Sequence, residues 1–579
     1  MRNLDKIIAY EDTSLKDLLR KLDEAPRYDL PGGIILIVDD KGKLIGTVTD
    51  GDIRRAILGR GTLDIPAEGI MTVDPIAFPE QYSIKQILES IVTELEKRNR
   101  KSKRFLSKIV LVDKDNRPTR VLDYHQLWEQ RVAMHRHLCV VGMGYVGLTL
   151  ALVLADEGYL VSGVDMDDSR IAALHAGESY IHETGLPELL REHINVNLRV
   201  DKSIPESADV FIISVGTPVE LQGEKHEPSM RYLIEATEGI ARRLKRGNLV
   251  ILRSTIPVGT CRNVVKELLE SGSGLKCGLD FHLSFAPERT AEGKALKELR
   301  SLPQIIGGYN QDSVEATAAV FREITPTIIK VDSLEAAEMA KLINNSFRDY
   351  VFAYSNQLAQ LASHFNINVF DVIRAANEGY PRDPVPMPSP GVGGPCLTKD
   401  PYIFAHVAES VQQDGELFRK GRAINISMHD HLVQRVLEVL RQLNKESKSC
   451  NVLVCGLAFK GNPETGDLRD STSVAIAHLL RSYTGAVYGF DPVASEEHIK
   501  ALNIIPVSVP EGFRDKDVVL FLNNHKNFEK LDVFAMVRAM REQPVVVDAW
   551  NLFKKEDILN ARPSVYMGLS FTQSSVGSK

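Results

Sequence analysis

The sequence lacks the cysteine spacing of a metal centre or of a disulfide framework. Its six cysteines are scattered along 579 residues, which predicts reduced thiols in the cytoplasm and no metal site. It also lacks an excess of basic residues, because the formal net charge is -7. A general nucleic-acid binder carries a basic face, so we expect no nucleic-acid partner.

No apolar signal core follows the first residues, so we expect no export signal. One stretch, 138–155, is apolar enough to raise the question of a membrane span. Its three glycines weaken a helix and fit a nucleotide-binding turn better, so we expect no membrane segment. A chain of this length exceeds a single core and predicts several domains.

Residues 1–130 carry a repeated pattern of their own. Two short apolar strands, 34–38 and 44–48, precede an amphipathic helix, and the same order recurs from residue 108, with a helix from about residue 124. This repeat resembles a tandem pair of CBS modules, a small fold that often binds adenine nucleotides.

Thr49 and Asp52 stand at the start of the first of these helices. In the CBS family a Thr/Ser-x-x-Asp motif offers a hydroxyl to phosphate and a carboxylate to ribose, so the resemblance implies a regulatory adenine-nucleotide site here. The second copy has Leu122 and His125 in these places, and at most one full site is expected. The alternative is that the pair only caps a helix.

A dinucleotide fingerprint begins near residue 138. A strand runs into Gly142-x-Gly144-x-x-Gly147 and a helix, and a second strand ends in Asp165. The glycines let the backbone approach a pyrophosphate at a helix N-terminus, and the acid bonds the ribose hydroxyls. Asp165 disfavours a 2′-phosphate, so the pattern predicts NAD rather than NADP.

Polar residues follow the later strands of the same alternating pattern. Residues just past the strand ends of a parallel sheet face the ligand crevice. We therefore expect four side chains to point at whatever the cofactor works on: Thr217, Thr255, Glu288 and Glu292.

A long helical pattern follows, from about Ser333 to Phe365. Lys341 and Asn345 are four residues apart and share one face of it. A helix of this length, apolar around residues 350–361, usually bridges domains and makes a dimer contact. We expect a homodimer or a higher homo-oligomer.

The loop from Pro390 to Asp400 is too rich in glycine and proline for a helix interior. It holds one thiol, Cys396, followed by Lys399 and Asp400. A nearby cation favours the nucleophilic thiolate, and a carboxylate takes a proton from water or holds a base in place. The alternative is a tight turn with a buried cysteine.

The last part of the chain starts with a strand at 451–459 that runs into glycine. Strands at 486–490, 518–522 and 545–548 alternate with helices and predict a second Rossmann-like unit. We expect the Ser-rich segment 565–579 to fray.

A thiol beside NAD indicates a particular chemistry, because a plain alcohol dehydrogenase needs no nucleophilic cysteine. The combination suits oxidation of an aldehyde to an acid through a thiohemiacetal and a thioester that water releases. Lys341 and Asn345 suit the stabilisation of oxyanions on that path.

From Leu138 to about Gly568 the chain resembles the UDP-glucose/GDP-mannose 6-dehydrogenase family, which oxidises C6 of a nucleotide sugar twice to give a uronate and two NADH. The matching motifs, in chain order, are Gly142-x-Gly-x-x-Gly147, Ser254-Thr-Ile-Pro-Val-Gly259, Pro287-Glu-Arg-Thr-Ala-Glu-Gly293, Lys341-x-x-x-Asn345, Gly393-Gly-Pro-Cys396-x-x-x-Asp400 and Phe459-Lys460.

The resemblance also implies site roles. For catalysis it implies Cys396 as nucleophile, Lys341 and Asn345 as oxyanion stabilisers, Asp400 with Thr255 as water-positioning groups, and Glu288 and Glu292 as candidate bases, with Asp400 an open alternative. For NAD it implies Gly142, Gly144, Gly147, Tyr145, Val146, Asp165, Arg170, Thr217 and Arg469. For the nucleotide sugar it implies Arg422, Lys460 and Gly393.

Three departures bear on these roles. Arg289 after Glu288 is similar to enzymes acting on UDP-N-acetylhexosamines, whereas Lys399 is shared with UDP-glucose enzymes. We expect a UDP-N-acetylhexosamine, with UDP-glucose or GDP-mannose as the alternative and a non-catalytic nucleotide-sugar-binding regulator as the rival class. The segment between Lys460 and Arg469 is longer than the commonest family spacing, which bears on Arg469.

The predicted fold is α/β: two Rossmann-like doubly wound domains joined by a long central helix, after a small α+β CBS-pair module. The predicted domains are a regulatory module at 1–130, an NAD-binding domain at 131–332, a central helical domain at 333–445 and a nucleotide-sugar-binding domain at 446–579.

Overall fold

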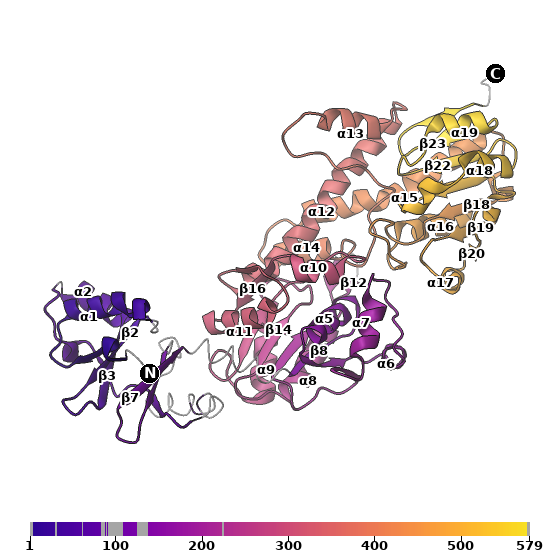
Figure 1. The fold of residues 1–579 in the computed structure, drawn as a ribbon. Coiled ribbons are helices and arrows are strands. Elements are labelled where there is room, and N and C mark those ends of the chain that lie inside the picture. Colours follow the sequence, from indigo (N-terminus) through magenta and orange to yellow (C-terminus); the bar gives the residue numbers. More distant parts are fainter. Residues whose placement is uncertain are drawn as a thin grey trace.

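The computed structural model describes residues 4–28, 32–60, 62–82, 87, 90, 108–123, 137–222 and 225–575. The predicted helix from about residue 124 and the second-copy position His125 lie outside these residues. Figure 1 shows the N-terminal module in indigo, a larger sheet domain, a long helix and a second sheet domain that ends the chain.

The N-terminal module contains two small sheets, in strand orders β1-β2-β3-β4 and β5-β6-β7. Its elements are β1 (Ile8–Tyr10), α1 (Leu15–Glu24), β2 (Ile34–Val38), β3 (Leu44–Thr49), α2 (Asp50–Arg60), β4 (Thr72–Val73), β5 (Ala77–Pro79), β6 (Lys108–Val112) and β7 (Pro118–Asp123). Apolar side chains of both sheets share one core.

The two copies of the predicted repeat use the same turn. In the first, the Asp39 carboxylate accepts the N–H groups of Lys41 and Lys43 at 2.9 and 2.8 Å. In the second, an Asp113 oxygen accepts two backbone N–H groups at 2.9 and 2.8 Å in the same way. The turns also meet, because Leu44 and Asn116 exchange hydrogen bonds of 2.8 and 3.0 Å. The predicted internal repeat is therefore confirmed within the described residues.

The second unit is an eight-stranded sheet in the order β10-β9-β8-β11-β14-β15-β16-β17. Its strands are β8 (His137–Val141), β9 (Leu160–Val164), β10 (Leu198–Asp201), β11 (Val210–Ile213), β14 (Leu249–Leu252), β15 (His282–Phe285), β16 (Gln304–Gly308) and β17 (Ile328–Lys330). Its helices are α5 (Tyr145–Asp156), α6 (Asp168–His175), α7 (Leu186–His193), α8 (Arg231–Ala241), α9 (Lys266–Ser273), α10 (Ala295–Ser301) and α11 (Gln311–Arg322).

Apolar side chains cover both faces of this sheet. On β8, Leu138 and Val140 belong to one core, whereas Cys139 and Val141 belong to the core on the opposite face. Strands buried on both faces are continuously apolar, which explains the long apolar stretch that begins at residue 138. The stretch divides into β8, the glycine turn and α5, so it is no single helix.

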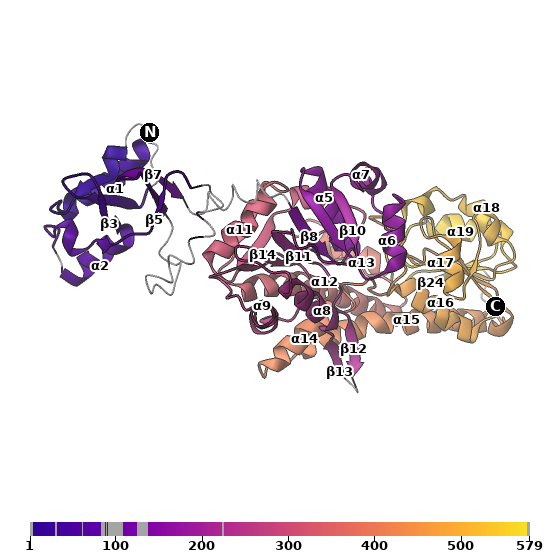
Figure 2. The same cartoon turned by 90° about the horizontal axis from the view of Figure 1, so that it is seen from below.

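A hairpin that the sequence did not indicate projects from this unit (Figure 2). Its strands are β12 (Val219–Gln222) and β13 (Lys225–Pro228). The His226 ring stacks on the Tyr402 ring with centroids 3.9 Å apart, so the hairpin lies against α14 (Asp400–Ser410).

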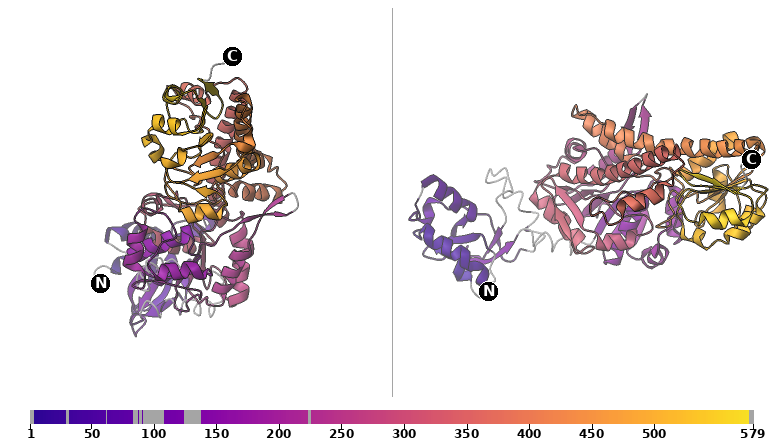
Figure 3. Two further views of the ribbon diagram at one scale, coloured as in Figure 1. Left: turned by 90° about the vertical axis from the view of Figure 1, so that its right-hand side faces the viewer. Right: turned by 90° about the horizontal axis from the view of Figure 1, so that it is seen from above.

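The central part is built on α12 (Leu334–Ser363), with α13 (Val369–Asn377), α14 and α15 (Glu416–Gln442). Ser333 caps α12, because its hydroxyl accepts the N–H of Ala336 at 3.1 Å. Figure 3 shows α12 and α15 running beside each other between the two sheet domains. The predicted long bridging helix is present.

The last unit is a seven-stranded sheet in the order β20-β19-β18-β21-β22-β23-β24. Its strands are β18 (Val452–Cys455), β19 (Val487–Phe490), β20 (Ile505–Pro506), β21 (Val518–Phe521), β22 (Val545–Asp548), β23 (Val565–Met567) and β24 (Thr572–Ser574). Its helices are α16 (Thr472–Tyr483), α17 (Glu496–Ala501), α18 (Val533–Ala539) and α19 (Lys555–Ala561). The predicted α/β class with two Rossmann-like sheets is confirmed.

The prediction that the segment from residue 565 frays is wrong for its described part. Val565, Tyr566 and Met567 are 2%, 1% and 0% exposed, and β24 pairs antiparallel with β23. Burial of these three side chains outweighs the polar composition that follows, so the segment closes one edge of the sheet.

Two further expectations concern what the chain does not contain. Among the described helices, none combines the length and the apolar character that crossing a membrane demands. Across residues 4–575 with the gaps stated above, no group of three or more His, Cys, Asp or Glu side chains is placed to hold a metal ion. The cytoplasmic location stays a prediction.

Candidate functional site

The turn between β8 and α5 has the close backbone approach that its glycines predict. Gly142 has a φ of 94°, a conformation that glycine adopts without strain. A Cβ on Gly147 would lie 1.8 Å from the carbonyl oxygen of Gly142, so only glycine fits there. A Cβ on Gly144 would meet nothing within 4 Å. The start of α5, at Tyr145 and Val146, is therefore open to an anion.

Asp165 lies directly after β9 and is 9% exposed. Its carboxylate accepts the N–H groups of Met143 at 2.9 Å and of Asp167 at 3.0 Å. Arg170 Nη1 lies 3.4 Å from the same carboxylate. A fixed carboxylate thus stands beside the glycine turn, and this set of residues fits the ribose and pyrophosphate of NAD.

The loops after β11 and β14 are tied together at the carboxyl edge of the sheet. The Thr217 hydroxyl donates to the Thr255 carbonyl oxygen at 2.5 Å, and the Ser254 hydroxyl donates to the Val215 carbonyl oxygen at 2.7 Å. Thr217 is buried and Thr255 is half-buried. The Thr217 hydroxyl thus holds the two loops together at this edge, while the Thr255 side chain is partly accessible.

The thiol loop, residues 390–400, precedes α14 and presents Cys396 with an exposed side chain. Part of the Cys396 residue is therefore open to solvent. The loop is shaped by the last domain: Gly394 N–H donates to the Asp470 carbonyl oxygen at 3.1 Å, and a Cβ on Gly394 would meet the Phe459 ring at 2.6 Å. Gly393 belongs to the same contact, because its Cβ would lie 2.5 Å from the Asp470 oxygen.

Lys341 on α12 is buried and points at the loop after β15. Its Nζ donates to the Glu288 carbonyl oxygen and lies 3.4 Å from Glu288 Oε2. Burial lowers the pKa of Lys341, but Glu288, Cys396 and Asp400 outweigh it and raise the pKa above its ordinary value. Lys341 therefore stays a cation.

Glu288 is the buried partner of this cation. Burial raises its pKa, but Lys341, hydrogen bonding from Thr290 and the Arg253 guanidinium together hold the pKa below its ordinary value. Glu288 is 7% exposed. It is therefore an ionised carboxylate between two cations, which counts against it as a proton acceptor near neutral pH.

Asp400 is the first residue of α14 and is 0% exposed. It accepts hydrogen bonds from Asn345 Nδ2 at 2.5 Å and from Lys399 Nζ at 2.6 Å. Asn345 is thus bonded to Asp400 in this structure. Lys399 forms an ion pair with the same carboxylate.

Protein surrounds the Cys396 sulfur on most sides even though part of its surface is exposed. Burial, with Asp400 second, raises the pKa of the Cys396 thiol to about 11, and Lys341 and Lys399 oppose this only in part. The sequence indicated a thiolate stabilised by Lys399. Because Lys399 is paired with Asp400, the resting group is a thiol.

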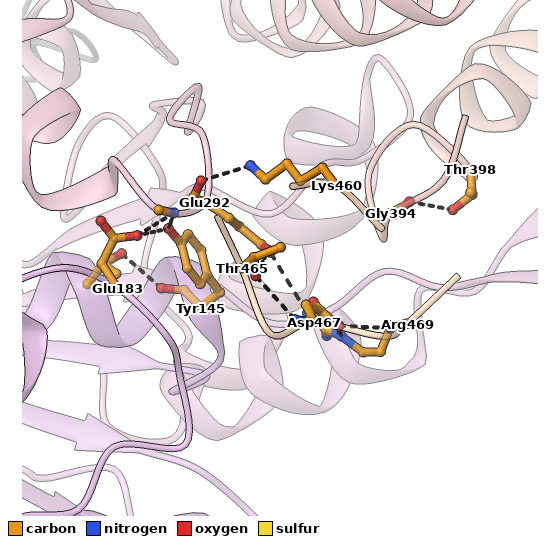
Figure 4. A network of polar contacts seen from close by, with 11 residues as sticks. Tyr145, Glu183, Glu292, Gly394, Thr398, Lys460, Thr465, Asp467 and Arg469 are labelled. Atoms are coloured by element: carbon orange, nitrogen blue, oxygen red, sulfur yellow. Dashed lines mark hydrogen bonds and ion pairs between the residues drawn. The ribbon is translucent and has the colours of Figure 1, made fainter. Parts of the chain in front are cut away.

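Glu292 lies between the two sheet domains (Figure 4). Its side chain accepts a hydrogen bond from Thr465 Oγ1 at 3.4 Å and lies 4.0 Å from Arg469 Nη2. Burial, with Asp467 second, raises the pKa of Glu292 to about 7, against the effect of Lys460 and Arg469. A carboxyl with this pKa exchanges protons readily at neutral pH.

The segment from Lys460 to Arg469 reaches across from the last domain. Lys460 Nζ donates to the Glu292 carbonyl oxygen at 2.8 Å. Arg469 Nε lies 3.0 Å from both oxygens of Asp467, as Figure 4 shows. The lengthened spacing therefore still brings Arg469 to the boundary with the NAD-binding sheet.

Arg422 lies inside the protein in this structure. It is 2% exposed, its Nη1 lies 2.6 Å from Asp349 Oδ1, and Nη1 and Nη2 both donate to the Val392 carbonyl oxygen at 3.2 Å. In this structure Arg422 reaches the thiol loop from inside the protein and holds its backbone. The motif predicted an arginine near the site, but not its burial.

Two residues of the site, Arg253 and Glu183, were not predicted from the sequence. Arg253 directly follows β14 and donates to the Gln304 side chain at 2.9 Å and to the Ala286 carbonyl oxygen at 3.2 Å. Glu183 accepts hydrogen bonds from the Tyr145 hydroxyl and from Gly293 N–H, the latter at 2.7 Å. An arginine directly after four apolar strand residues was the available signal for Arg253, whereas nothing marked Glu183.

In the N-terminal module, Thr49 and Asp52 bond each other. Asp52 Oδ2 accepts Thr49 N–H at 2.8 Å and the Thr49 hydroxyl at 2.7 Å, and Asp52 Oδ1 lies 2.6 Å from Arg55. This is a capping arrangement at the start of α2. A ribose bound at Asp52 would have to replace these bonds.

Each part of the chain matches a family model of known proteins. Three models of the UDP-glucose/GDP-mannose dehydrogenase family match: the NAD binding domain at residues 136–325, the central domain at 335–427 and the UDP binding domain at 453–555. A CBS domain model matches residues 2–59, the first copy of the repeat.

Curated relatives and solved structures agree with these matches. A UDP-N-acetyl-D-mannosamine dehydrogenase of Methanococcus aeolicus is 33% identical over 419 residues, which cover 72% of this chain and 91% of that protein. The UDP-D-ManNAc dehydrogenase structure from Pyrococcus horikoshii has a TM-score of 0.66 at 30% identity, covering 75% and 99% of the two chains. A UDP-glucose dehydrogenase structure from Pyrobaculum islandicum has a TM-score of 0.65 at 26% identity, covering 75% of this chain and 98% of that one.

These matches confirm the recognised family and the NAD cofactor, because the NAD binding domain model spans the glycine turn and Asp165. They also confirm the predicted enzyme class, an NAD-dependent dehydrogenase acting on a nucleotide sugar. The chain belongs to the UDP-glucose/GDP-mannose dehydrogenase family.

Proposed function

We propose that the protein oxidises the C6 hydroxyl of a UDP-N-acetylhexosamine, UDP-N-acetyl-D-mannosamine before others, to the uronate in two successive steps. The observation that carries this proposal is the Cys396 thiol, on a partly exposed residue and set among Lys341, Asp400 and Lys399 beside the NAD-binding sheet. One oxidation would need no such thiol. A second oxidation needs a covalent intermediate that water can release as an acid.

Each residue has a task that its surroundings support. When bound, NAD accepts the hydride in each oxidation. Cys396 loses its proton and forms a carbon–sulfur bond to the aldehyde carbon, giving a thiohemiacetal and then, after the second oxidation, a thioester. The cationic Lys341 stabilises negative charge on the reacting oxygen. Water adds to the thioester, the carbon–sulfur bond breaks, and the thiol and the carboxylate are restored.

The hydrolytic step needs a base and an oriented water. We assign the base to Glu292, because its pKa of about 7 suits proton exchange and Glu288 is held ionised between two cations. Asp400 is bonded to Asn345 and Lys399, so with Thr255 it orients the water. Asn345 acts on the oxyanion once substrate displaces it from Asp400.

The choice of sugar rests on the relatives and on one residue. Several relatives near 33% identity carry the name UDP-N-acetyl-D-mannosamine dehydrogenase. Arg289 follows Glu288 and donates to the Pro303 carbonyl oxygen, so it shapes the loop that carries both candidate bases. UDP-glucose is the alternative substrate, and GDP-mannose is the next.

We also propose that two copies of the chain pair through α12. Its outer face carries exposed large apolar side chains at Ile343, Phe347, Tyr354 and Leu361, between 49% and 64% exposed. A row of such side chains along one helix is unusual on a free surface. A second copy of the same face would cover it.

Finally, we propose that the N-terminal module binds an adenine nucleotide and shifts dehydrogenase activity. The CBS domain match over residues 2–59 includes Thr49 and Asp52. The motifs of the dehydrogenase site all lie after Leu138, so a sensor is the better account of the module. The competing account is that it supports only assembly.

The first prediction concerns stoichiometry. Each uronate formed should be accompanied by two NADH, measured by absorbance against product. Cys396→Ser should reduce acid formation to below about 1% of the original rate, because the hydroxyl is a far weaker nucleophile. Cys450→Ser, which replaces a thiol outside this site, is the control. One NADH per product, with free aldehyde released, would contradict the mechanism.

The second prediction concerns pH. Glu292 must be ionised to accept a proton, so kcat should rise about tenfold between about pH 6 and about pH 8 and then level off. Asp467→Asn should move this limb to lower pH, because Asp467 contributes to the raised pKa. Glu292→Gln should lose most of the activity together with the limb. A profile unchanged by both variants would count against Glu292 as the base.

The third prediction concerns the substrate. Among UDP-ManNAc, UDP-GlcNAc, UDP-glucose and GDP-mannose, kcat/KM should be highest for UDP-ManNAc. A hydrogen-bonding site for the N-acetyl group should reject sugars without it by about 100-fold or more. The highest kcat/KM on UDP-glucose would refute the choice of sugar and leave the reaction type intact.

The fourth prediction concerns assembly. The full chain should have the mass of a dimer or a larger oligomer by light scattering, and Phe347→Asp should lower that mass. Leu58, exposed in the N-terminal module, provides Leu58→Asp as a matched control that should leave it unchanged. A monomeric parent chain at micromolar concentration would defeat this proposal.

The fifth prediction concerns regulation. AMP, ADP or ATP should bind the full chain in calorimetry, and Asp52→Asn should weaken binding because it removes an acceptor for the ribose hydroxyls. The effect on substrate affinity should be about 5- to 150-fold, as is typical of coupled sites. Asp23→Asn, on the exposed end of α1, is the control. No binding by any of the three would favour the assembly role.

A further inference from the structure

Glu338 on α12 is a fully buried carboxylate that the proposed chemistry does not use. It is 0% exposed, and no ion pair of the described residues includes it. Burial raises its pKa against the effect of its hydrogen bonds. A buried carboxylate without a cation is costly, so its surroundings must supply strong hydrogen-bond donors.

Those donors are two backbone N–H groups of one loop. Gly259 N–H donates to Glu338 Oε2 at 2.5 Å, and Cys261 N–H donates to Oε1 at 2.8 Å. Gly259 has a φ of 91°, so the chain turns sharply at the contact. Each oxygen of the Glu338 carboxylate thus accepts one N–H group of a tight turn, and together they hold the turn to α12.

The gripped loop, residues 254–261, is the one that carries Thr255. It has a second attachment to the same scaffold, since Val258 packs against a buried cluster of Leu342, Ile403 and Val407. Leu342 is on α12 and the other two are on α14. The loop is therefore fastened to the two helices that bear the thiol-site residues.

Glu338 lies close to Lys341 and Asn345 along α12. It lies three residues before Lys341 and seven before Asn345, which places all three within about two turns of one helix. Asp400, the other water-positioning group, is bonded to Asn345 at 2.5 Å. One rigid helix thus fixes Thr255 on one side and Asp400 on the other.

We propose that Glu338 is a positioning residue for thioester hydrolysis: by holding the Gly259 turn to α12 it sets the place of Thr255 relative to Asp400 and so orients the water. It touches no reacting atom. This inference rests on the proposed function, in which Thr255 and Asp400 act on water.

The consequence is a selective defect. Displacement of an orienting group by about 1 Å can cost about 100-fold in rate. Formation of the thioester depends on Cys396, Lys341 and NAD, and in the described hydrogen bonds neither Cys396 nor Lys341 contacts the gripped loop. Loss of the grip should therefore slow hydrolysis and spare the oxidations.

The experiment uses the full-length enzyme with UDP-ManNAc and NAD. In Glu338→Gln the amide keeps one acceptor but presents N–H to the other donor, so the steady-state rate should fall about 10- to 100-fold. The rapid initial burst of NADH should keep its rate constant. Intact-mass measurement should show the acylated enzyme accumulating on Cys396. A burst slowed as much as the steady state, or no change in either, would overturn the proposal.

Glu335→Gln is the matched control. Glu335 is one turn earlier on α12 and pairs with Arg262 at 2.5 Å, next to the gripped turn but without contact to it. It should leave burst and steady state unchanged. If Glu335→Gln gave the same selective defect as Glu338→Gln, a general loosening of this region would replace the proposal.

A double-substitution cycle separates positioning from stability. If Glu338 acts through Thr255, Glu338→Gln should cost less than about twofold in the Thr255→Ala enzyme, because coupled residues are not additive. Additive losses would overturn the proposal even if Glu338→Gln lowered the melting temperature. If the parent enzyme itself formed no acyl adduct and released one NADH per turnover, the proposed function would fail, which is a distinct outcome.

Discussion

The pairing of buried charges around Lys341 is the constraint on which the site depends. A lysine at 5% exposure keeps its charge only where carboxylates surround it. Glu288 supplies one from the NAD-binding domain, and Asp400 adds to the effect from the start of α14. Because these groups come from separate elements, the charge balance holds only when α12, the sheet edge and the thiol loop are all in place.

The same requirement explains why the last domain takes part in the site. Gly394 and Gly393 of the thiol loop lie against the backbone around Asp470, and Lys460 reaches back to the Glu292 carbonyl oxygen at 2.8 Å. The loop that carries the thiol is thus shaped by a separate domain. The placement of the thiol depends on the contact between the last domain and the loop.

Sequence patterns predicted the glycine turn, Asp165 and the strand-end residues because local rules govern them: a tight turn needs glycine, and strand ends face the crevice. They did not predict the burial of Arg422 or the pairing of Lys399 with Asp400, because a motif fixes residue identity but not which neighbour takes up a charge. The contact of Glu338 with the Gly259 turn was not predicted for the same reason. In a helical run Glu338 is indistinguishable from a solvated glutamate until the loop that it holds is placed. The prediction of a frayed segment from residue 565 was wrong because it relied on the Ser-rich composition and neglected three apolar residues at the start of the segment.

The closing strand of the last sheet has a consequence for the order of synthesis. Thr572 N–H donates to Asn366 Oδ1 at 2.7 Å, and Asn366 Nδ2 donates to the Thr572 carbonyl oxygen at 3.2 Å. This reciprocal pair joins residues 206 positions apart. The turn before α13 therefore gains its partner only after residues 367–572 have been synthesised. The edge of the last sheet is completed later than the NAD-binding sheet, whose last strand ends at Lys330.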